Sequence, residues 1–434
     1  MKIAHIMPEW PHHGQLWFWR EICCLRGWGM DVSIFSTRRP RPQDRARHAF
    51  ADAGEAETFY LWPQGKWRVA WDLLCCFLYS PLGFLRCMAL AFSLDVEARP
   101  RWKYVLPLLV PACIFAREAR RRGIEHIHCH TASKSAILCM MVRRLNGTPF
   151  SLIVNADIGW WGGAMRQKFA DTAFTLLCTR VMVREMERDY PSIPPDRYAL
   201  GRVGVDARQW TPPPGGRPPR EDGELRILSV SRLVKSKGQD VLLRAVALLK
   251  QSGLSVCLRI GGNGPEMDAL QALSRELQLT EAVAFLGFID ESQYMAEMRS
   301  ADVFVLASHQ EPMGVVYMEA MATEIPTIGT NAGGVPEIIT DNVNGLLVPP
   351  NDPPALAAAL RRLHEQPELR ATLGQAARQT ILNEFDSHLW AAELYRRFTG
   401  HAPPSADHIT QRHAESAQIM VKDATKSQPT LLSA

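Results

Sequence analysis

The chain has 434 residues, which exceeds one ordinary core and suits two or three domains of typical size. Apolar residues make up 47% and charged residues 22%, a globular balance that excludes a largely disordered or collagen-like protein. The net charge of +4 conceals an asymmetry, because residues 1–220 carry 31 Lys and Arg against 19 Asp and Glu, whereas residues 221–434 carry 18 against 26.

The first half alternates predicted strands and helices. A strand over 2–7, a helix ending at Leu25 and a second strand over 31–36 form one βαβ unit. Similar units are expected at 126–129, 150–154 and 176–183. The first half should therefore contain a parallel sheet.

Three uncharged runs lie within the first half, at 73–85, 87–94 and 104–116. A membrane-spanning helix needs about 20 apolar residues, and none of the runs is that long. Aromatic and cationic residues around short apolar helices are typical of a face that lies on an anionic bilayer, and buried helices of a large core are the alternative. The surrounding residues are Trp62, Trp67, Trp71, Trp102, Arg99, Arg101, Lys103 and the run 120–122.

A linker separates this half from a second set of strands and helices. Residues 212–219 read Pro-Pro-Pro-Gly-Gly-Arg-Pro-Pro, a density of proline that no helix or sheet tolerates. Two successive sets of parallel units predict an α/β protein with two doubly wound, Rossmann-like domains that face each other across a cleft. Ligands of such sheets bind at the carboxyl ends of the strands. Strands of the second half are expected at 226–231, 256–261, 283–286, 303–306, 327–329 and 345–348.

Two cations follow the first strand of the second half. Arg232 comes at the strand end, and Lys237 precedes a helix that begins near Gln239. Cations beside a helix N-terminus form a site for a diphosphate, because the helix adds amide donors and the positive end of its dipole. A solvated basic loop is the alternative.

The next loop, 261–266, is rich in glycine but does not fit the pattern G-x-G-x-x-G, so a nicotinamide cofactor is not expected. Pro265 is predicted to be the first residue of a helix. Gly262 allows either the close approach of a ligand or a tight turn.

The most specific pattern is a Glu-Pro-Met-Gly loop that leads into a helix. At the helical rise, Glu319 lies at most about 12 Å from Glu311, too far for the two carboxylates to share a proton. That distance matches the span from the sugar to the ribose of a nucleotide sugar, so the two residues suit anchors for hydroxyl groups. The amides of Gly314 and Val315 at the helix start can meet an anionic or carbonyl oxygen. Two exposed glutamates on a helix are the alternative.

Together these residues resemble the retaining glycosyltransferases of family 4, which have the GT-B fold. Glu311 and Glu319 match the E-x7-E element of that family, and Arg232 and Lys237 match its R-L-x-x-x-K-G element. Further similar segments are Gly-Gly-Val-Pro-Glu at 333–337 and Asn-Gly-Leu-Leu-Val-Pro-Pro at 344–350.

The resemblance implies a role for each residue. Arg232 and Lys237 would hold the donor diphosphate, Glu311 the sugar hydroxyls and Glu319 the ribose. No metal or other cofactor is implied, because the two cations and helix dipoles offset the charge of the leaving diphosphate. The expected donor-binding residues are Arg232, Lys237, Glu311, Met313, Gly314, Val315, Glu319, Gly14 and Gly262.

The first half resembles glycosyltransferases that make exopolysaccharides such as colanic acid and amylovoran, through residues 12–22, 127–130 and 149–158. Where relatives carry histidine beneath the transferred sugar, this chain has Asn155, which can bond a hydroxyl group but cannot gain a charge near neutral pH. In the retaining mechanism proposed for the family, the departing phosphate oxygen deprotonates the acceptor. The catalytic candidates are Glu311 and Asn155, and the acceptor-side candidates are His130 and Asp157.

The resemblance also predicts the domain organisation. The expected parts are an acceptor-side domain over 1–208, a linker over 209–224, a donor-binding domain over 225–379, a helix over 380–399 that crosses back to the first domain, and a flexible tail over 400–434.

Two other functions remain open. A non-catalytic GT-B scaffold of a polysaccharide assembly complex is suggested by Asn155 and by Gln15, where many relatives have a second glycine. A sugar-nucleotide epimerase shares the fold and the nucleotide. The expected partners are a nucleotide sugar donor, a saccharide or lipid-linked acceptor and the surface of an anionic membrane, with no nucleic acid.

Cysteine usage predicts the compartment. Nine of the ten cysteines precede residue 180, with no CxxC pair and no Cys/His spacing typical of a metal site. Neither a disulfide framework nor a zinc site is expected, and the N-terminus does not resemble a secretory signal. We therefore expect a cytoplasmic protein that associates peripherally with the inner face of the plasma membrane.

Overall fold

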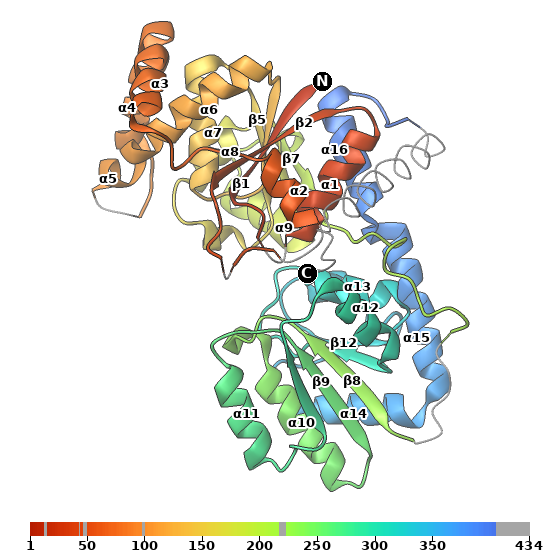
Figure 1. Ribbon diagram of the computed structural model, residues 1–434. Helices are drawn as coiled ribbons and strands as arrows, with labels where there is room; N and C mark the ends of the chain where they lie inside the picture. Colours follow the sequence, from red (N-terminus) through yellow and green to blue (C-terminus); the bar gives the residue numbers. More distant parts are fainter. Residues whose placement is uncertain (13–14, 43, 47–49, 98–99, 217–222, 405–434) are drawn as a thin grey trace, which may run out of the picture.

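The computed structural model describes the chain except for residues 13–14, 43, 47–49, 98–99, 217–222 and 405–434. Two parallel sheets with their helices form two domains, drawn one above the other in Figure 1. Most of the tail expected over 400–434 and part of the linker expected over 209–224 lie outside the described residues.

The first domain contains a seven-stranded parallel sheet with the order β3-β2-β1-β4-β5-β6-β7. Its central strands β4 and β5 are buried along their whole length, as is typical of a parallel sheet covered by helices. The strands are β1 (Lys2–Glu9), β2 (Asp31–Arg38), β3 (Phe59–Tyr60), β4 (His126–Cys129), β5 (Phe150–Val154), β6 (Thr175–Leu177) and β7 (Tyr198–Leu200). The helices are α1 (Leu16–Gly27), α2 (Phe50–Glu57), α3 (Lys66–Tyr79), α4 (Pro81–Ser93), α5 (Arg101–Val105), α6 (Leu109–Arg122), α7 (Lys134–Asn146), α8 (Met165–Asp171) and α9 (Arg180–Asp189).

The second domain contains a six-stranded parallel sheet with the order β10-β9-β8-β11-β12-β13. The strands are β8 (Leu225–Val230), β9 (Val256–Gly261), β10 (Val283–Gly287), β11 (Val303–Val305), β12 (Thr327–Thr330) and β13 (Leu346–Val348). The helices that follow the strands are α10 (Gln239–Gln251), α11 (Met267–Glu276), α12 (Glu291–Ser300), α13 (Val315–Ala322), α14 (Pro353–Glu365) and α15 (Pro367–Thr380).

In both sheets the strand order changes direction beside the first strand, between β1 and β4 and between β8 and β11. The prediction of two doubly wound parallel-sheet domains is confirmed. Ligands of such sheets bind at the carboxyl edge next to the switch point. The loops after β8 and β11, which carry Arg232, Lys237 and Glu311, lie at that position in the second domain.

One predicted boundary is wrong. Pro265 does not begin a helix, because α11 starts at Met267. The residues before it form a turn against the β8 loop, in which the Glu266 amide donates to the Leu233 carbonyl oxygen at 3.1 Å. A helix that began at Pro265 would leave the Glu266 amide without a partner in its first turn, whereas the observed turn gives this amide the Leu233 carbonyl oxygen.

The C-terminal helices join the two domains. A π-helical turn over Ile381–Phe385 connects α15 to α16 (Ser387–Thr399), which packs on α1 of the first domain (Figure 1). At the crossing, Val205 exchanges backbone hydrogen bonds of 2.9 Å with Phe385 and Ser387. The chain therefore passes twice between the domains, and the two passages are bonded to each other.

The uncharged runs of the first half divide between core and surface. Helix α6 is buried over most of residues 109–116, whereas α3 and α4 expose large apolar side chains. Among the described residues no single helix is long and apolar enough to cross a membrane, although α3 and α4 pass that test together with a bend of 110° between them.

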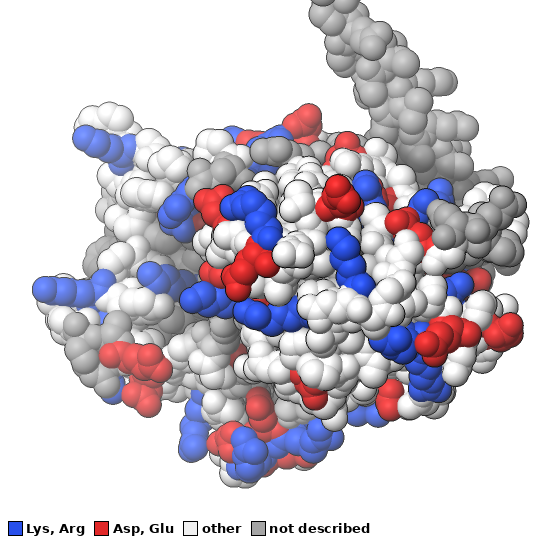
Figure 2. Space-filling view, turned by 90° about the horizontal axis from the view of Figure 1, so that it is seen from below, with Lys and Arg blue, Asp and Glu red and all other residues white. Residues whose placement is uncertain are grey.

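The face seen from below in Figure 2 carries charges of both signs. Seen from below, Lys and Arg side chains are mixed with Asp and Glu side chains over the surface (Figure 2). Such a face has no extended field of one sign.

Candidate functional site

The loops after β8 and β11 bring Lys237 and Glu311 together. The Lys237 ammonium group forms an ion pair with Glu311 Oε2, and the Ser308 hydroxyl donates to the same oxygen at 3.4 Å. Glu311 is only 6% exposed, so the alternative of an exposed glutamate is excluded for this residue. Arg232 is exposed at the end of β8. A carboxylate thus lies beside an ammonium group at the switch point of the sheet.

The turn between Glu311 and α13 requires glycine. Gly314 has φ of +77°, and a Cβ added there would lie 2.4 Å from Cδ2 of Tyr317. Helix α13 begins at the next residue, Val315, and Met313 is buried. The free amides at this helix start therefore lie in the same loop as Glu311.

Gly262 serves loop packing in this structure. Its φ is +126°, and an added Cβ would lie 1.8 Å from the Ser231 carbonyl oxygen. The neighbouring Leu233 amide donates to the Asn263 carbonyl oxygen at 2.9 Å. Glycine therefore lets the β9 loop lie against the β8 loop, which carries Arg232.

Glu319 has partners from both domains. It is 7% exposed, and its Oε1 lies 3.7 Å from Nη1 of Arg20 on α1. The Tyr294 hydroxyl of α12 donates to Oε2 at 3.1 Å. Burial, followed by the charge of Glu319, raises the pKa of Tyr294 well above its ordinary value, which keeps this hydroxyl protonated as a donor. The sequence did not identify Arg20 or Tyr294, because only the fold brings them to Glu319.

Two residues after β5 reach toward the second domain. Asp157 Oδ2 accepts a hydrogen bond of 2.6 Å from the Gln310 side chain, next to Glu311. Asn155 is half-buried, and its Nδ2 donates to the His130 carbonyl oxygen at 3.4 Å. Trp160, in a short 3-10 turn that follows, is 79% exposed. The first domain thus contributes an amide, a carboxylate and an open aromatic face at the carboxyl edge of its sheet.

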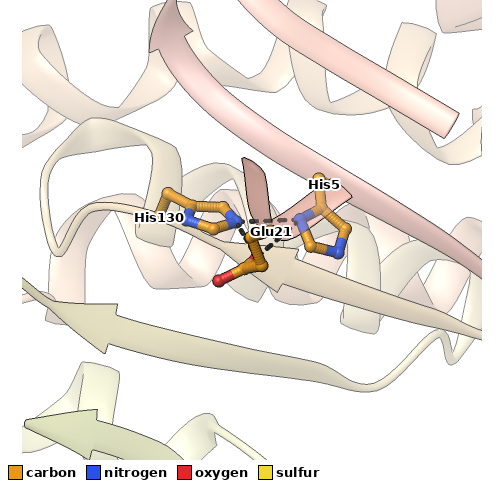
Figure 3. Close-up of side chains that lie close together, drawn as sticks. All are labelled: His5, Glu21 and His130. Atoms are coloured by element: carbon orange, nitrogen blue, oxygen red, sulfur yellow. Dashed lines mark hydrogen bonds and ion pairs between the residues drawn. The ribbon is translucent and has the colours of Figure 1, made fainter. Parts of the chain in front are cut away.

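His130 lies in the interior of the first domain, in contrast to the expectation that it faces the acceptor. Its side chain is fully buried and packs edge-on against Phe18, with ring centroids 4.6 Å apart. Its Nε2 lies 2.9 Å from Nδ1 of His5 and 3.2 Å from Oε1 of Glu21 (Figure 3). The contact of His130 with the site is therefore made by its backbone, through Asn155. Gly14, another expected site residue, lies outside the described residues.

The group of His5, Glu21 and His130 joins distant elements. Burial lowers the pKa of His5 to about 4. Burial would raise the pKa of Glu21, but attraction to His130 and hydrogen bonds from both histidines hold it well below the usual range. Glu21 Oε2 also accepts a bond of 3.0 Å from Nε1 of Trp390 on α16. This carboxylate therefore fixes the crossing helix to the first domain.

The same three residues could hold a metal ion, although the sequence predicted no metal. Their ligand atoms lie within 4.8 Å of one another, and no other such group occurs in the described part of the chain. The residues come from β1, α1 and the end of β4, so their sequence spacing gives no ligand pattern. They are fully enclosed and separate from Lys237 and Glu311, so a metal here would support structure and not the chemistry of the cleft.

A carboxylate of the second domain caps a helix of the first. Glu337 accepts hydrogen bonds from the amides of Arg180 and Val181 at 2.8 and 3.0 Å, at the N-terminus of α9. A carboxylate at this end of a helix meets unpaired amides and the positive end of the dipole. The segment 333–337 was noted only as a family resemblance, and this cross-domain contact was not predicted.

Comparison with known proteins agrees with this arrangement. Residues 217–380 match the family model for glycosyl transferases group 1. A glycogen synthase of Mycobacterium tuberculosis is 34% identical over 185 residues, which are 43% of this chain and 44% of that protein. WcaL of Escherichia coli, named for colanic acid biosynthesis, is 34% identical over 208 residues, 46% of this chain and 50% of that protein. The chain thus spans about half the length of the curated relatives it matches.

Solved structures share the fold over nearly the whole chain. HepE of Anabaena, crystallised with UDP and glucose, gives a TM-score of 0.68 over 92% of this chain and 100% of that chain, at 16% identity. At this identity the similarity shows the fold alone, which is GT-B. The protein therefore has the two-domain GT-B fold, and its residues 217–380 match the group 1 glycosyltransferase model.

Proposed function

We propose that the protein is a retaining glycosyltransferase that moves a hexose from a nucleotide diphosphate sugar to a saccharide or lipid-linked saccharide. The observation that carries the proposal is the pairing of Lys237 with the buried Glu311 at the switch point of the second domain. The group 1 domain over 217–380 supports it. The colanic acid relative supports a role in exopolysaccharide or other cell-surface polysaccharide synthesis.

On the donor side, the Lys237 ammonium group has three N–H donors, so it can donate to Glu311 and to a phosphate oxygen at the same time. Arg232 supplies a second cation from the exposed end of β8. The sugar hydroxyls donate to Glu311, and the ribose shares Glu319 with Arg20 and Tyr294. The complex of HepE with UDP and glucose supports a nucleotide sugar of this size in the fold.

On the acceptor side, the hydroxyl oxygen attacks the anomeric carbon on the face from which the diphosphate leaves. The bond from the anomeric carbon to the phosphate oxygen breaks, the new glycosidic bond forms, and the acceptor proton passes to the departing phosphate oxygen. No side-chain base is required, which is consistent with Asn155 at this position. Arg232 and Lys237 offset the charge of the diphosphate, so we propose that the transfer needs no metal.

The acceptor is proposed to be a saccharide that stacks on Trp160. This ring is 79% exposed, and it follows Asp157, which contacts the second domain beside Glu311. An amphipathic indole with one open face offers contact area to a sugar ring at little entropic cost. The protein is proposed to work at the inner face of the plasma membrane, where lipid-linked acceptors lie.

Incubation of the purified protein with radiolabelled sugar nucleotides and a membrane extract tests the proposal. We expect label to enter a lipid or polymer fraction with wild type and with Lys235→Met, an exposed lysine of the same turn. Lys237→Met and Glu311→Gln should lose this incorporation. A changed sugar nucleotide without an acceptor product would instead indicate an epimerase. Unchanged polymer production in cells that carry Glu311→Ala would indicate a scaffold.

A further inference from the structure

Helices α3, α4 and α5 project from the first domain (Figure 1) and carry most of its exposed apolar surface. Ten of the seventeen exposed large apolar side chains among the described residues lie on these three helices. We call these ten the apolar face. They are Trp67, Trp71, Leu74, Phe77, Leu78, Tyr79, Leu82, Leu85, Phe92 and Trp102.

The amphipathic pattern of α3 is reversed relative to a surface helix. Its inner side holds the buried Asp72, which pairs with Arg117 on α6 and lies 3.6 Å from Nε of Arg68. Its outer side carries Trp67, which is 90% exposed, and Trp71 four residues later. A helix of a water-soluble surface places its polar residues outward and its apolar residues inward. The outer side of α3 is therefore suited to an apolar medium.

The projecting helices are fixed so that this face cannot fold back onto the protein. The Cys76 thiol of α3 contacts the Cys113 carbonyl oxygen of α6 at 3.5 Å, and the Cys87 thiol of α4 contacts the Met141 carbonyl oxygen of α7 at 3.4 Å. At Gly83 an added Cβ would lie 2.3 Å from a backbone oxygen of α7. Close packing on the inner sides of α3 and α4 thus holds their outer sides toward the surroundings.

The charges on these helices favour an anionic surface. The acid on α3, α4 and α5 is the buried Asp72 alone, whereas five cations lie on the same helices. Two of the five are ion-paired, Arg68 with Asp72 and Arg101 with the exposed Asp95 between α4 and α5. Tryptophans with Lys and Arg at the edge of an apolar face are typical of the boundary between lipid headgroups and acyl chains. The five cations are Lys66, Arg68, Arg86, Arg101 and Lys103.

The lengths of α3 and α4 and the bend between them suit helices that lie in the plane of a membrane surface. Helices α3 and α4 have 14 and 13 residues and meet at 110°. A spanning helix needs about 20 residues, whereas a helix in the interface buries its apolar face to a depth of about 5–10 Å. A bent pair with both outer sides apolar can bury both helices at that depth.

We propose that the apolar face of α3, α4 and α5 inserts into the surface of an anionic bilayer. This inference specifies how the proposed glycosyltransferase contacts the membrane. It rests on the proposed function only where it concerns the lipid-linked acceptor. Lipid binding itself is measured without glycosyl transfer. The two proposals can therefore fail separately.

Cosedimentation with phosphatidylglycerol–phosphatidylcholine vesicles tests the proposal. Wild type should sediment with these vesicles, less with phosphatidylcholine alone, and less at high salt. The variant Trp67→Ser/Trp71→Ser/Leu78→Ser should bind more weakly by about tenfold for each side chain removed from the bilayer. The control Leu248→Ser/Val343→Ser/Leu389→Ser removes exposed apolar groups elsewhere and should bind as wild type.

Several outcomes would overturn the inference. In the first, wild type does not bind anionic vesicles, and in the second, the two triple variants bind equally. In the third, light scattering shows a wild-type dimer that the α3 variant converts to a monomer. Quenching of tryptophan fluorescence by brominated lipids should be strong for wild type and weaker for the α3 variant. Calorimetry with sugar nucleotides provides the separate readout, because the α3 variant should retain donor binding. Vesicle binding without any donor binding in wild type would refute the glycosyltransferase and leave this inference standing.

Discussion

Removal of Lys237 and removal of Glu311 should destabilise the protein unequally. In Lys237→Met, the Glu311 carboxylate stays buried at 6% exposure, with the Ser308 hydroxyl 3.4 Å away. A buried pair that loses one partner typically costs about 3–5 kcal/mol, and we expect about 2–3 kcal/mol because the lysine side chain is partly open to water. In Glu311→Gln, the ammonium group can turn toward solvent on its flexible stem, so we expect about 1 kcal/mol.

Urea unfolding followed by circular dichroism measures these costs for the two single variants and for Lys237→Met/Glu311→Gln. The double variant should be less destabilised than the sum of the single variants by about 1–2 kcal/mol, because Glu311→Gln removes the charge that Lys237→Met leaves without its ammonium partner. Lys235→Met serves as the control, with a change within about 0.5 kcal/mol. Equal losses of stability in the two single variants, or losses that add without coupling, would show that Glu311 does not depend on Lys237 for its charge.

Three further predictions concern contacts away from this pair. Glu337→Ala should weaken the N-terminus of α9 by about 1 kcal/mol, seen as faster hydrogen exchange of its first amides, and unchanged protection would contradict the cross-domain cap. Trp160→Ala should raise KM for a saccharide acceptor and leave donor binding unchanged, whereas an unchanged KM would exclude the stacking role. Burial lowers the pKa of His126 from 6.5 to about 4, so the unfolded chain binds a proton that the folded chain does not, and stability should fall as pH drops through this range. His126→Gln should flatten that fall in acid unfolding, and the same slope in wild type and variant would contradict it.

The sequence was sufficient for the fold because the fold depends on local patterns. Apolar runs of strand length recur between helical stretches, and the run of prolines at 212–219 marks where one sheet ends before the next begins. Two parallel sheets follow from this alternation alone. Pro265 was misplaced because its turn is fixed by the Leu233 carbonyl oxygen in another loop, which no local pattern reveals.

The candidate site was predictable only within one domain. Lys237 and Glu311 follow strands that are neighbours of a common switch point, so their proximity follows from topology. The partners of Glu319 could not be predicted, since Arg20 comes from α1 of the other domain. His130 was an acceptor-side candidate within the segment that resembles exopolysaccharide glycosyltransferases, but its side chain points into the core toward His5. The register of side chains at a strand end is set by packing and not by sequence position.

The outward face of α3 presented a different difficulty. The sequence showed an uncharged run with flanking tryptophans, which fits a buried helix and a membrane helix equally well. The choice depends on which side of the helix holds Asp72, and only the packing on α6 shows that this side is the inner one.

Titration calorimetry with a panel of UDP and GDP sugars tests whether the site at Lys237 and Glu311 binds a sugar nucleotide. We expect wild type to bind at least one sugar nucleotide and Lys235→Met to bind it equally well. Lys237→Met should bind it at least about tenfold more weakly, because a lost charge-assisted contact to phosphate is worth about 1.5–3 kcal/mol. Binding of no sugar nucleotide by wild type, or equal binding by Lys237→Met, would contradict the assignment of this site to the donor.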